Sequence, residues 1–352
     1  MKIVGVMIVK NEEHVIERCL KSAAKIANTF VIVDTGSTDK TYEKIVKIMD
    51  ELNLEIITYQ KPWVNFGHNR SEALKLAKGQ GDYALIIDAD DEFEGTIKSE
   101  LTADAYSISV KSGVTTFNQT RLMKLDMPWR YVGCVHEYPT CENVKAWPYL
   151  PDIKINTNND GNSWKDPNKY KTYALLLWKE HLDDPTNART VFYLAQSFRD
   201  CADYEEAERW YKKRIEMGGW MGEIWYSQFY LGKLEHSRGN IANAVKWFLD
   251  AYNTDTRRVE TLYELMKMYH ILKQYNTAYL FGIEALAKPI PDDALFPIPS
   301  NYGIDLYEEL GLCAFYSNHF EVAKNAWEKI LSMDISDATK ERILKNISFI
   351  PN

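Results

Sequence analysis

Short apolar runs alternate with helical stretches over roughly the first 90 residues of the chain. The predicted strands, rich in β-branched residues, are 2–9, 30–34, 55–59 and 83–88. The segments with apolar positions at helical spacing are 11–28, 37–52 and 69–78. Strands that alternate with helices indicate βαβ units and a parallel sheet, in which ligands bind beyond the carboxyl ends of the strands.

The pattern changes after residue 104. Three short β-like segments, 105–110, 120–125 and 129–138, follow one another without a long helical stretch between them, which predicts an antiparallel extension of the sheet. Residues 148–167 are rich in Pro, Asn, Asp and Gly and resemble a loop. We therefore expect an α/β domain with a mixed, Rossmann-like sheet over residues 1–150, followed by a linker over 151–170.

Residues 171–352 are mostly helical and contain a repeat. Four similar helical segments align on Ala207, Ala244, Ala278 and Ala323, with spacings of 37, 34 and 45 residues. The last spacing is lengthened by the Pro-rich insert KPIPDDALFPIP. Helix pairs with a period near 34 are typical of tetratricopeptide repeats, in which a small residue lets two helices pack closely. We expect the Trp and Tyr side chains here to fill the core between helices.

Composition and charge exclude several classes of protein. A chain of 352 residues is long enough for about two domains, and its net charge of -8 argues against a nucleic-acid-binding surface. The five cysteines are widely spaced and form no Cys-x-x-Cys pair, which favours reduced thiols. The apolar start is too short to span a bilayer. We therefore expect a cytoplasmic protein without a membrane span.

The fourth predicted strand ends in the acidic stretch IIDADDEFEG, residues 86–95. Three interpretations compete: a helix N-terminus that favours acids, a calcium loop, and a divalent metal site at a strand end. Phe93 occupies the place of the glycine that an EF-hand loop requires, which excludes the second. Asp88 and Asp90 lie two residues apart on an extended chain, so their carboxylates leave on the same face as hard ligands for one cation.

Further polar residues follow the other predicted strands. Asn11 and Glu12 follow the first strand, and Asp34 ends the second before a Gly-Ser-Thr turn. Arg70 lies near the start of a predicted helix, where its guanidinium suits a diphosphate or a carboxylate. Each residue alone has an ordinary role in capping or ion pairing. Together they predict a site for a nucleoside diphosphate and a metal ion.

The motifs VKNEE, VDTGSTDKT and NFGHNRSEALKLAKGQGDYALIIDADD, in this order, resemble the family-2 glycosyltransferases of the GT-A fold. More narrowly, the chain is similar to members with C-terminal tetratricopeptide repeats, which include enzymes that glycosylate peptides. The resemblance covers about the first 140 residues well. It implies a nucleotide-sugar donor, usually a uridine diphosphate sugar.

The resemblance also implies roles for individual residues. It assigns Mn²⁺ or Mg²⁺ to the pair Asp88 and Asp90 and the nucleotide base to Asp34. It places Asn11, Glu12 and Arg70 around the nucleotide.

One departure concerns the catalytic base. Many members carry a Glu-Asp pair after the metal motif, and this chain has no Glu-Asp dipeptide. The best substitute is Glu137 as general base, with His136 as a further metal ligand, provided that the chain turns near Pro139. Asp91 is the alternative base, and Trp129 is a candidate for stacking on a sugar.

The resemblance implies an inverting transfer, and no nucleophile for a retaining mechanism is evident in the sequence. The acceptor is a peptide, a protein or a glycan, and the repeats could also form a homodimer. Two other functions stay open: a sugar nucleotidyltransferase, and a repeat scaffold with an inactive transferase domain. A dinucleotide oxidoreductase fits less well, because the glycine motif at residues 79–84 precedes its strand instead of following it.

Overall fold

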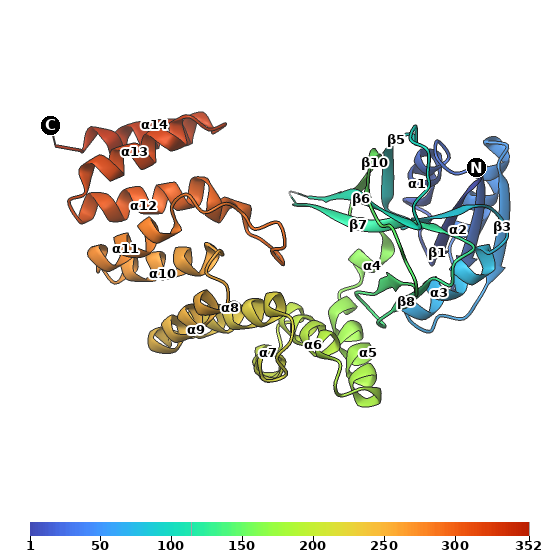
Figure 1. Cartoon of the computed structure of the whole chain (residues 1–352), viewed down its shortest axis with the longest axis horizontal. Coiled ribbons are helices and arrows are strands. Elements are labelled where there is room, and N and C mark those ends of the chain that lie inside the picture. Colours follow the sequence, from blue (N-terminus) through green and yellow to red (C-terminus); the bar gives the residue numbers. More distant parts are fainter. Residues whose placement is uncertain (114, 352) are drawn as a thin grey trace. The chain divides into compact units, whose positions relative to one another are not determined.

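The computed structural model describes residues 1–113 and 115–351 and divides into two compact units, Met1–Pro185 and Thr186–Asn352 (Figure 1). The first is a mixed α/β unit and the second is entirely helical. This division confirms the expected α/β domain followed by helical repeats.

The α/β unit is built on an eight-stranded sheet with the order β3-β2-β1-β4-β7-β6-β10-β5. Its strands are β1 (Ile3–Val9), β2 (Thr29–Asp34), β3 (Glu55–Gln60), β4 (Tyr83–Ile87), β5 (Asp91–Gly95), β6 (Ala105–Ser112), β7 (Thr115–Lys124) and β10 (Tyr149–Thr157). Its helices are α1 (Ile16–Ala23), α2 (Thr41–Glu51), α3 (Phe66–Ala77), α4 (Asn162–Lys165) and α5 (Lys169–Asp183).

The first four strands are parallel, as predicted, and α1, α2 and α3 provide the crossovers between them. Strand β1 is central: it pairs with β2 on one side and with β4 on the other. Six of its seven residues are buried, because helices cover both faces of a parallel sheet. The predicted antiparallel extension is present where β7 pairs with β4 and with β6.

The first part of the segment expected to be a linker, residues 151–157, belongs to the sheet. Strand β10 lies between β6 and β5, parallel to the former and antiparallel to the latter. Its Leu150, Ile153 and Ile155 are buried, and a register shift against β6 accommodates Pro151. The first unit consequently extends to Pro185, beyond the expected boundaries at residues 150 and 170. The sequence did not predict this strand for two reasons: it contains Asn, Asp and Pro, which are typical of loops, and its buried positions do not alternate regularly.

Residues 130–140 form a separate two-stranded sheet, in which β8 (Arg130–Val132) pairs with β9 (Tyr138–Thr140). The connection between them turns sharply, with Gly133 at φ +97° and His136 at φ +52°. The turn anticipated near Pro139 is therefore present, just before β9.

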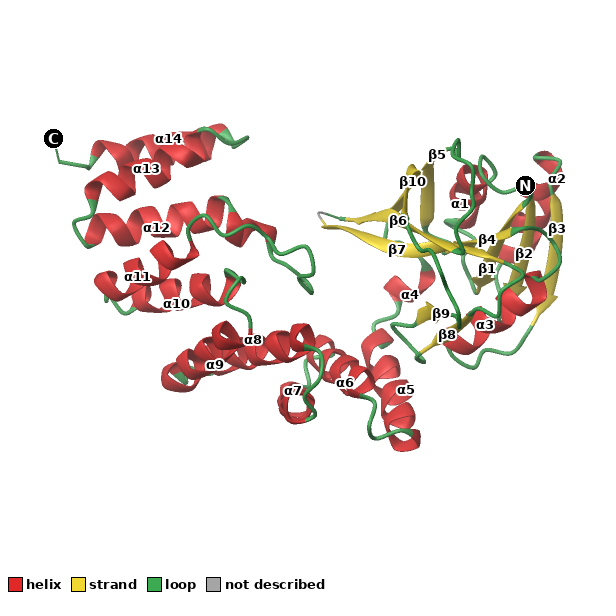
Figure 2. Cartoon of the chain, viewed as in Figure 1, coloured by secondary structure: helices red, strands yellow, loops and turns green. Residues whose placement is uncertain are grey.

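The helical unit consists of α-helices joined by short loops and one longer insert (Figure 2). They are α6 (Ala188–Asp200), α7 (Tyr204–Glu216), α8 (Met221–Ser237), α9 (Ile241–Thr254), α10 (Glu260–Ile271), α11 (Tyr275–Ala285), α12 (Ile304–Tyr316), α13 (Phe320–Leu331) and α14 (Asp337–Ser348). Consecutive helices pack as the pairs α6–α7, α8–α9, α10–α11 and α12–α13.

Small residues set the spacing within these pairs. The four repeated alanines are fully buried, one in the second helix of each pair. A Cβ added at Gly232 would lie 2.7 Å from the Phe248 ring, and one at Gly311 would lie 2.2 Å from Nε1 of Trp327. Only glycine therefore allows these large rings to approach the neighbouring helix, which is the packing expected for tetratricopeptide-like repeats.

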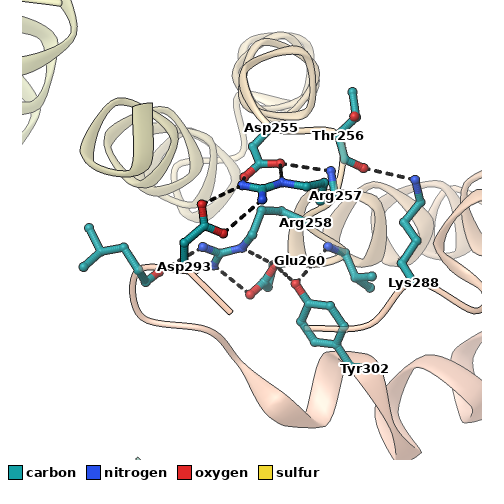
Figure 3. A network of polar contacts seen from close by, with 10 residues as sticks. Asp255, Thr256, Arg257, Arg258, Glu260, Lys288, Asp293 and Tyr302 are labelled. Carbon is teal, nitrogen blue, oxygen red and sulfur yellow. Dashed lines mark hydrogen bonds and ion pairs between the residues drawn. The ribbon is translucent and has the colours of Figure 1, made fainter. Parts of the chain in front are cut away.

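The insert between α11 and α12 is fastened by a buried ion pair (Figure 3). Arg258 donates to the Glu260 carboxylate from Nε at 2.9 Å and from Nη2 at 2.7 Å. Glu260 also accepts from the Tyr302 hydroxyl at 2.8 Å and from the backbone N–H of Ile298 at 3.1 Å. Arg258 donates in addition to the carbonyl of Leu295 at 3.0 Å, so the pair holds the insert at several points.

Over the described part of the chain, none of the helices combines the length and the apolar character needed to cross a bilayer.

Candidate functional site

A cavity of about 600 Å³ opens at the carboxyl ends of the parallel strands. Residues after β1 and β2 and the end of β4 form one wall, and β6, β7 and residues 157–176 form the others. The predicted site residues that line it are Glu12, Arg70, Asp88 and Asp90. This volume lies within the range of small-molecule sites.

Asp88 is held between two arginines. Arg70 donates to one of its carboxylate oxygens through a short hydrogen bond, and Nη2 of Arg121 lies 2.7 Å from the other. Burial alone would raise the pKa of Asp88, but the charges of Arg121 and Arg70 outweigh it and hold this pKa below its usual range. Asp88 is therefore an ionised carboxylate whose two oxygens already have cationic partners.

Among the described residues, Asp90 and Glu12 have no ion-pair partner, although the Glu12 carboxylate accepts from the Asn162 backbone N–H at 2.9 Å. Burial, and then the nearby charge of Asp88, raise the pKa of Asp90. Burial also raises the pKa of Glu12 to about 7, and Asp90 adds to this. Gly161 lies beside both: a Cβ there would come within 3.3 Å of Glu12 Oε2 and 3.4 Å of Asp90 Cγ. The two side chains form an electronegative corner that a cation would stabilise.

Asp91 lies behind this corner and is fully buried. Its carboxylate accepts from the Asp88 backbone N–H at 3.0 Å and, through a short hydrogen bond, from the Thr157 hydroxyl. Burial raises its pKa, although Arg121 opposes the effect. Asp91 does not line the cavity, and its contacts tie β5 to β10 and to the end of β4.

Asp34 and Asn11 organise the loops beside the cavity. Asp34 Oδ1 accepts from the backbone N–H groups of Gly36 at 2.9 Å and Ser37 at 2.7 Å. Asn11, at φ +57°, accepts from the Thr38 N–H at 2.7 Å. Neither side chain lines the cavity. The Asp34 bonds shape the turn after β2, and the Asn11 bond joins this turn to the end of β1.

Arg70 also joins Glu137 to the site. Asn65 caps α3 by accepting from the His68 N–H at 2.8 Å, and Arg70 lies one turn into this helix. Its Nε donates to Glu137 at 2.6 Å, so one guanidinium connects Glu137 with Asp88. Glu137 itself does not line the cavity, and its side chain is 13% exposed.

The close approach of α3 to the β8–β9 turn depends on glycine. A Cβ at Gly67 would lie 2.2 Å from the carbonyl oxygen of Gly133. His136, in the same turn, packs its ring edge-on to Tyr173 at 6.0 Å and does not line the cavity. Among the described residues, Asp88, Asp90 and His136 do not form a trio of ligand atoms within 4.8 Å of one another.

Trp129 lies in the core instead of the cavity. It is 8% exposed and packs against Trp147, with ring centroids 5.5 Å apart. Other aromatic residues line the cavity: Trp63, Phe66, Phe117, Trp164 and Tyr173.

The sequence interpretation missed two groups of site residues. Arg121 stands beside Leu122 and Met123 in a predicted strand, and a charge in such a position requires a buried partner, a signal that was available. Trp164 and Lys169 belong to the segment taken as a linker, where nothing in the local pattern indicates a cavity wall. The Lys169 ammonium lies 3.3 Å from the centroid of the Trp164 ring.

Comparison with known proteins shows similarity to glycosyl transferases over the strands that lead to the cavity. The model of the family "Glycosyl transferase family 2" matches residues 6–106. An uncharacterized glycosyltransferase of Rickettsia bellii is 36% identical over 100 residues, which are 28% of this chain and 31% of the relative. The chain thus spans about a third of that relative's length.

Two further similarities extend into the helical unit. A TPR repeat-containing protein of Synechococcus elongatus is 23% identical over 308 residues, covering 80% of this chain and 74% of the relative. The crystal structure of MamA covers 50% of this chain and 92% of its own, at 16% identity and a TM-score of 0.38. The matched residues 6–106 contain the end of β1, strands β2 to β4 and the acidic end of β4, so the N-terminal unit is similar to the family 2 glycosyl transferases in the part that holds most of the predicted site residues.

Proposed function

We propose that this chain is a metal-dependent, inverting glycosyltransferase that moves a sugar from a nucleoside diphosphate donor to a peptide, protein or glycan. A uridine diphosphate sugar is the first donor to test. The observation that carries the proposal is the cavity at the strand ends, where Asp90 and Glu12 face a space that Arg70 and Arg121 also line.

The donor atoms in this cavity suit Mn²⁺ or Mg²⁺. Both ions prefer oxygen ligands, and Asp90 and Glu12 offer carboxylates whose pKa values are raised mainly by burial, so a bound cation would favour their ionised forms. We assign the ion to Asp90 with Glu12 beside it. Asp88 would not be the main ligand of this ion, because both of its carboxylate oxygens are paired with Arg70 and Arg121. When bound, the ion supplies Lewis-acid stabilisation of the leaving diphosphate.

The chain's own residues would orient the donor and the acceptor. Arg70 and Arg121 fix the Asp88 carboxylate at the end of β4, and their guanidinium N–H groups are of the kind that bind phosphate oxygens. Lys169 adds a further cation to the wall. Trp63, Trp164 and Tyr173 offer apolar surface for a sugar or an acceptor side chain.

Glu137 is the proposed base, because it is bonded to Arg70 and so lies next to the cavity wall. It would take the proton of the acceptor, a contribution of typically ~10² to 10⁴ in rate. Asp91 is the weaker candidate, since its carboxylate is fully buried and bonded to Thr157 and to the Asp88 N–H.

The first experiment tests donor use. The protein is incubated with a panel of nucleotide sugars and Mn²⁺, with and without candidate peptide acceptors, and released diphosphate is measured. We expect turnover with one donor, and loss of metal-dependent donor binding in Asp90→Ala with the fold unchanged. Glu55→Gln is a matched control, since Glu55 begins β3 at the opposite end of the sheet. No turnover with any donor would favour a repeat scaffold, and unchanged donor affinity in Asp90→Ala would contradict the metal assignment.

The second experiment concerns the base. Glu137→Gln should keep donor binding and lose transfer, because an amide can still accept from Arg70 but cannot take a proton. Full transfer activity in this variant would remove Glu137 from the mechanism.

A further inference from the structure

Three potential metal ligands meet in the helical unit, apart from the proposed transferase site. His270 is on α10, and Glu309 and Cys313 are on α12, four residues apart and therefore on one face of the helix. One ligand atom from each lies within 4.8 Å of the other two, and Nδ1 of His270 is 2.5 Å from Glu309 Oε1. Among the described residues, no other trio of His, Cys, Asp or Glu comes together in this way.

The environment combines a buried thiol with two partly accessible side chains. Cys313 is fully buried and free of any disulfide, whereas the side chains of His270 and Glu309 are 24% and 17% exposed. An ion could therefore enter from the exposed side and reach the thiol, and a water molecule could complete its coordination there. Burial, and secondarily Glu309, raise the pKa of the Cys313 thiol to about 12, so it is protonated when no cation is near.

The ligand types discriminate between metals. Sulfur, imidazole nitrogen and one carboxylate oxygen suit Zn²⁺, whereas Mg²⁺ and Mn²⁺ prefer sites made of oxygen. A zinc ion deprotonates a coordinating thiol outright, and one thiolate with one carboxylate balances its charge. With Zn–ligand bonds of about 2.0 to 2.3 Å, tetrahedral ligand atoms lie roughly 3.3 to 3.7 Å apart. Since the ligand atoms lie within 4.8 Å of one another, their separations would have to change by about 1 Å to reach these values.

The position of the trio suggests what an ion would do. Helix α10 is the first helix of one pair and α12 the first helix of the next, and residues between α11 and α12 include the long insert. A metal bridge between α10 and α12 would join consecutive repeats directly, across the connection where the repeat spacing is longest.

We propose that His270, Glu309 and Cys313 form a zinc-type metal site that links two consecutive helix pairs of the repeat unit.

Cobalt titration tests this site. The full chain, stripped with a chelator, is titrated with Co²⁺, and the near-ultraviolet absorption is followed for thiolate-to-cobalt charge transfer, which oxygen-only sites cannot produce. We expect this band to appear, to vanish when Zn²⁺ displaces Co²⁺, and to correspond to one tightly held ion. Zn²⁺ should also raise the midpoint of thermal unfolding of the helical signal.

Variants locate the signal. Cys313→Ser should abolish the band, while His270→Gln and Glu309→Gln should weaken affinity at least tenfold. Because the last two replace partly exposed side chains, they are expected to fold even if Cys313→Ser does not, and circular dichroism checks this. Cys201→Ser and His319→Gln, in the same unit, are the matched controls.

A variant of the proposed transferase site shows whether the cobalt signal comes from the helical unit. Asp90→Asn should leave the cobalt band unchanged, whether or not the chain proves to be a transferase. Absence of the band in the wild-type chain, or a band that persists in Cys313→Ser, would overturn the proposal.

Discussion

The Arg258–Glu260 pair allows a quantitative prediction for the helical unit. The two side chains are 2% and 0% exposed, and the Arg258 guanidinium lies 3.7 Å from the centroid of the Trp225 ring. Glu260→Gln removes the negative charge with little change of shape. Arg258 would then remain buried without an ionic partner, and such a loss costs about 3–5 kcal/mol.

Urea unfolding of the full chain measures this cost. Far-ultraviolet circular dichroism reports mainly on the helical unit, and with a denaturant slope of about 2 kcal/mol per molar its midpoint should fall by roughly 1.5–2.5 M. Arg257→Gln is the matched control. Arg257 pairs with Asp255 and Asp293, but its side chain is 57% exposed, so we expect Arg257→Gln to leave the unfolding midpoint nearly unchanged.

A double variant separates lost charge from lost packing. Arg258→Met combined with Glu260→Leu leaves no buried charge, so it should be more stable than Glu260→Gln alone. The reasoning is refuted if Glu260→Gln and Arg257→Gln lower the midpoint equally.

Three further predictions concern the α/β unit. Gly67→Ala should lower its stability by about 1–3 kcal/mol in urea unfolding, because the added methyl group would overlap the Gly133 carbonyl. Gly161→Ala should leave the unfolding midpoint unchanged and weaken Mn²⁺-dependent donor binding roughly tenfold in a thermal-shift titration, because the methyl group crowds Asp90. Arg121→Lys should destabilise by about 1–3 kcal/mol, because an ammonium cannot replace a guanidinium that contacts two carboxylates. Wild-type stability in this last variant would contradict the role given to the arginine.

The sequence predicted the fold well where periodicity and burial agree. Strand β1 is apolar along its length, and the alanine spacing reports helix packing directly, so both were recognisable. Strand β10 was not, because Pro151 and neighbouring polar residues disrupt its pattern, while Ile153 and Ile155 are buried in a core built from residues distant in sequence.

The site was predictable in part for a similar reason. Asp88 and Asp90 were found because the end of a parallel strand is a position that the local pattern reveals. The sequence could not show that Asp88 has arginine partners and Asp90 has not. Arg121 belongs to β7, which is distant in sequence, and it pairs with Asp88 only in the folded structure. Trp129 was predicted to be in the site and lies in the core. The local sequence does not show whether an aromatic side chain lines a cavity or fills a core.

The segment between β10 and α5 determines where this protein can be divided. Residues 162–176 contribute to the cavity wall, and the chain then continues through α5 to the start of the repeats. Truncation at residue 150 would remove the strand between β5 and β6 together with that wall. Exchange of the repeat unit for another should therefore succeed only with a junction at or after Pro185.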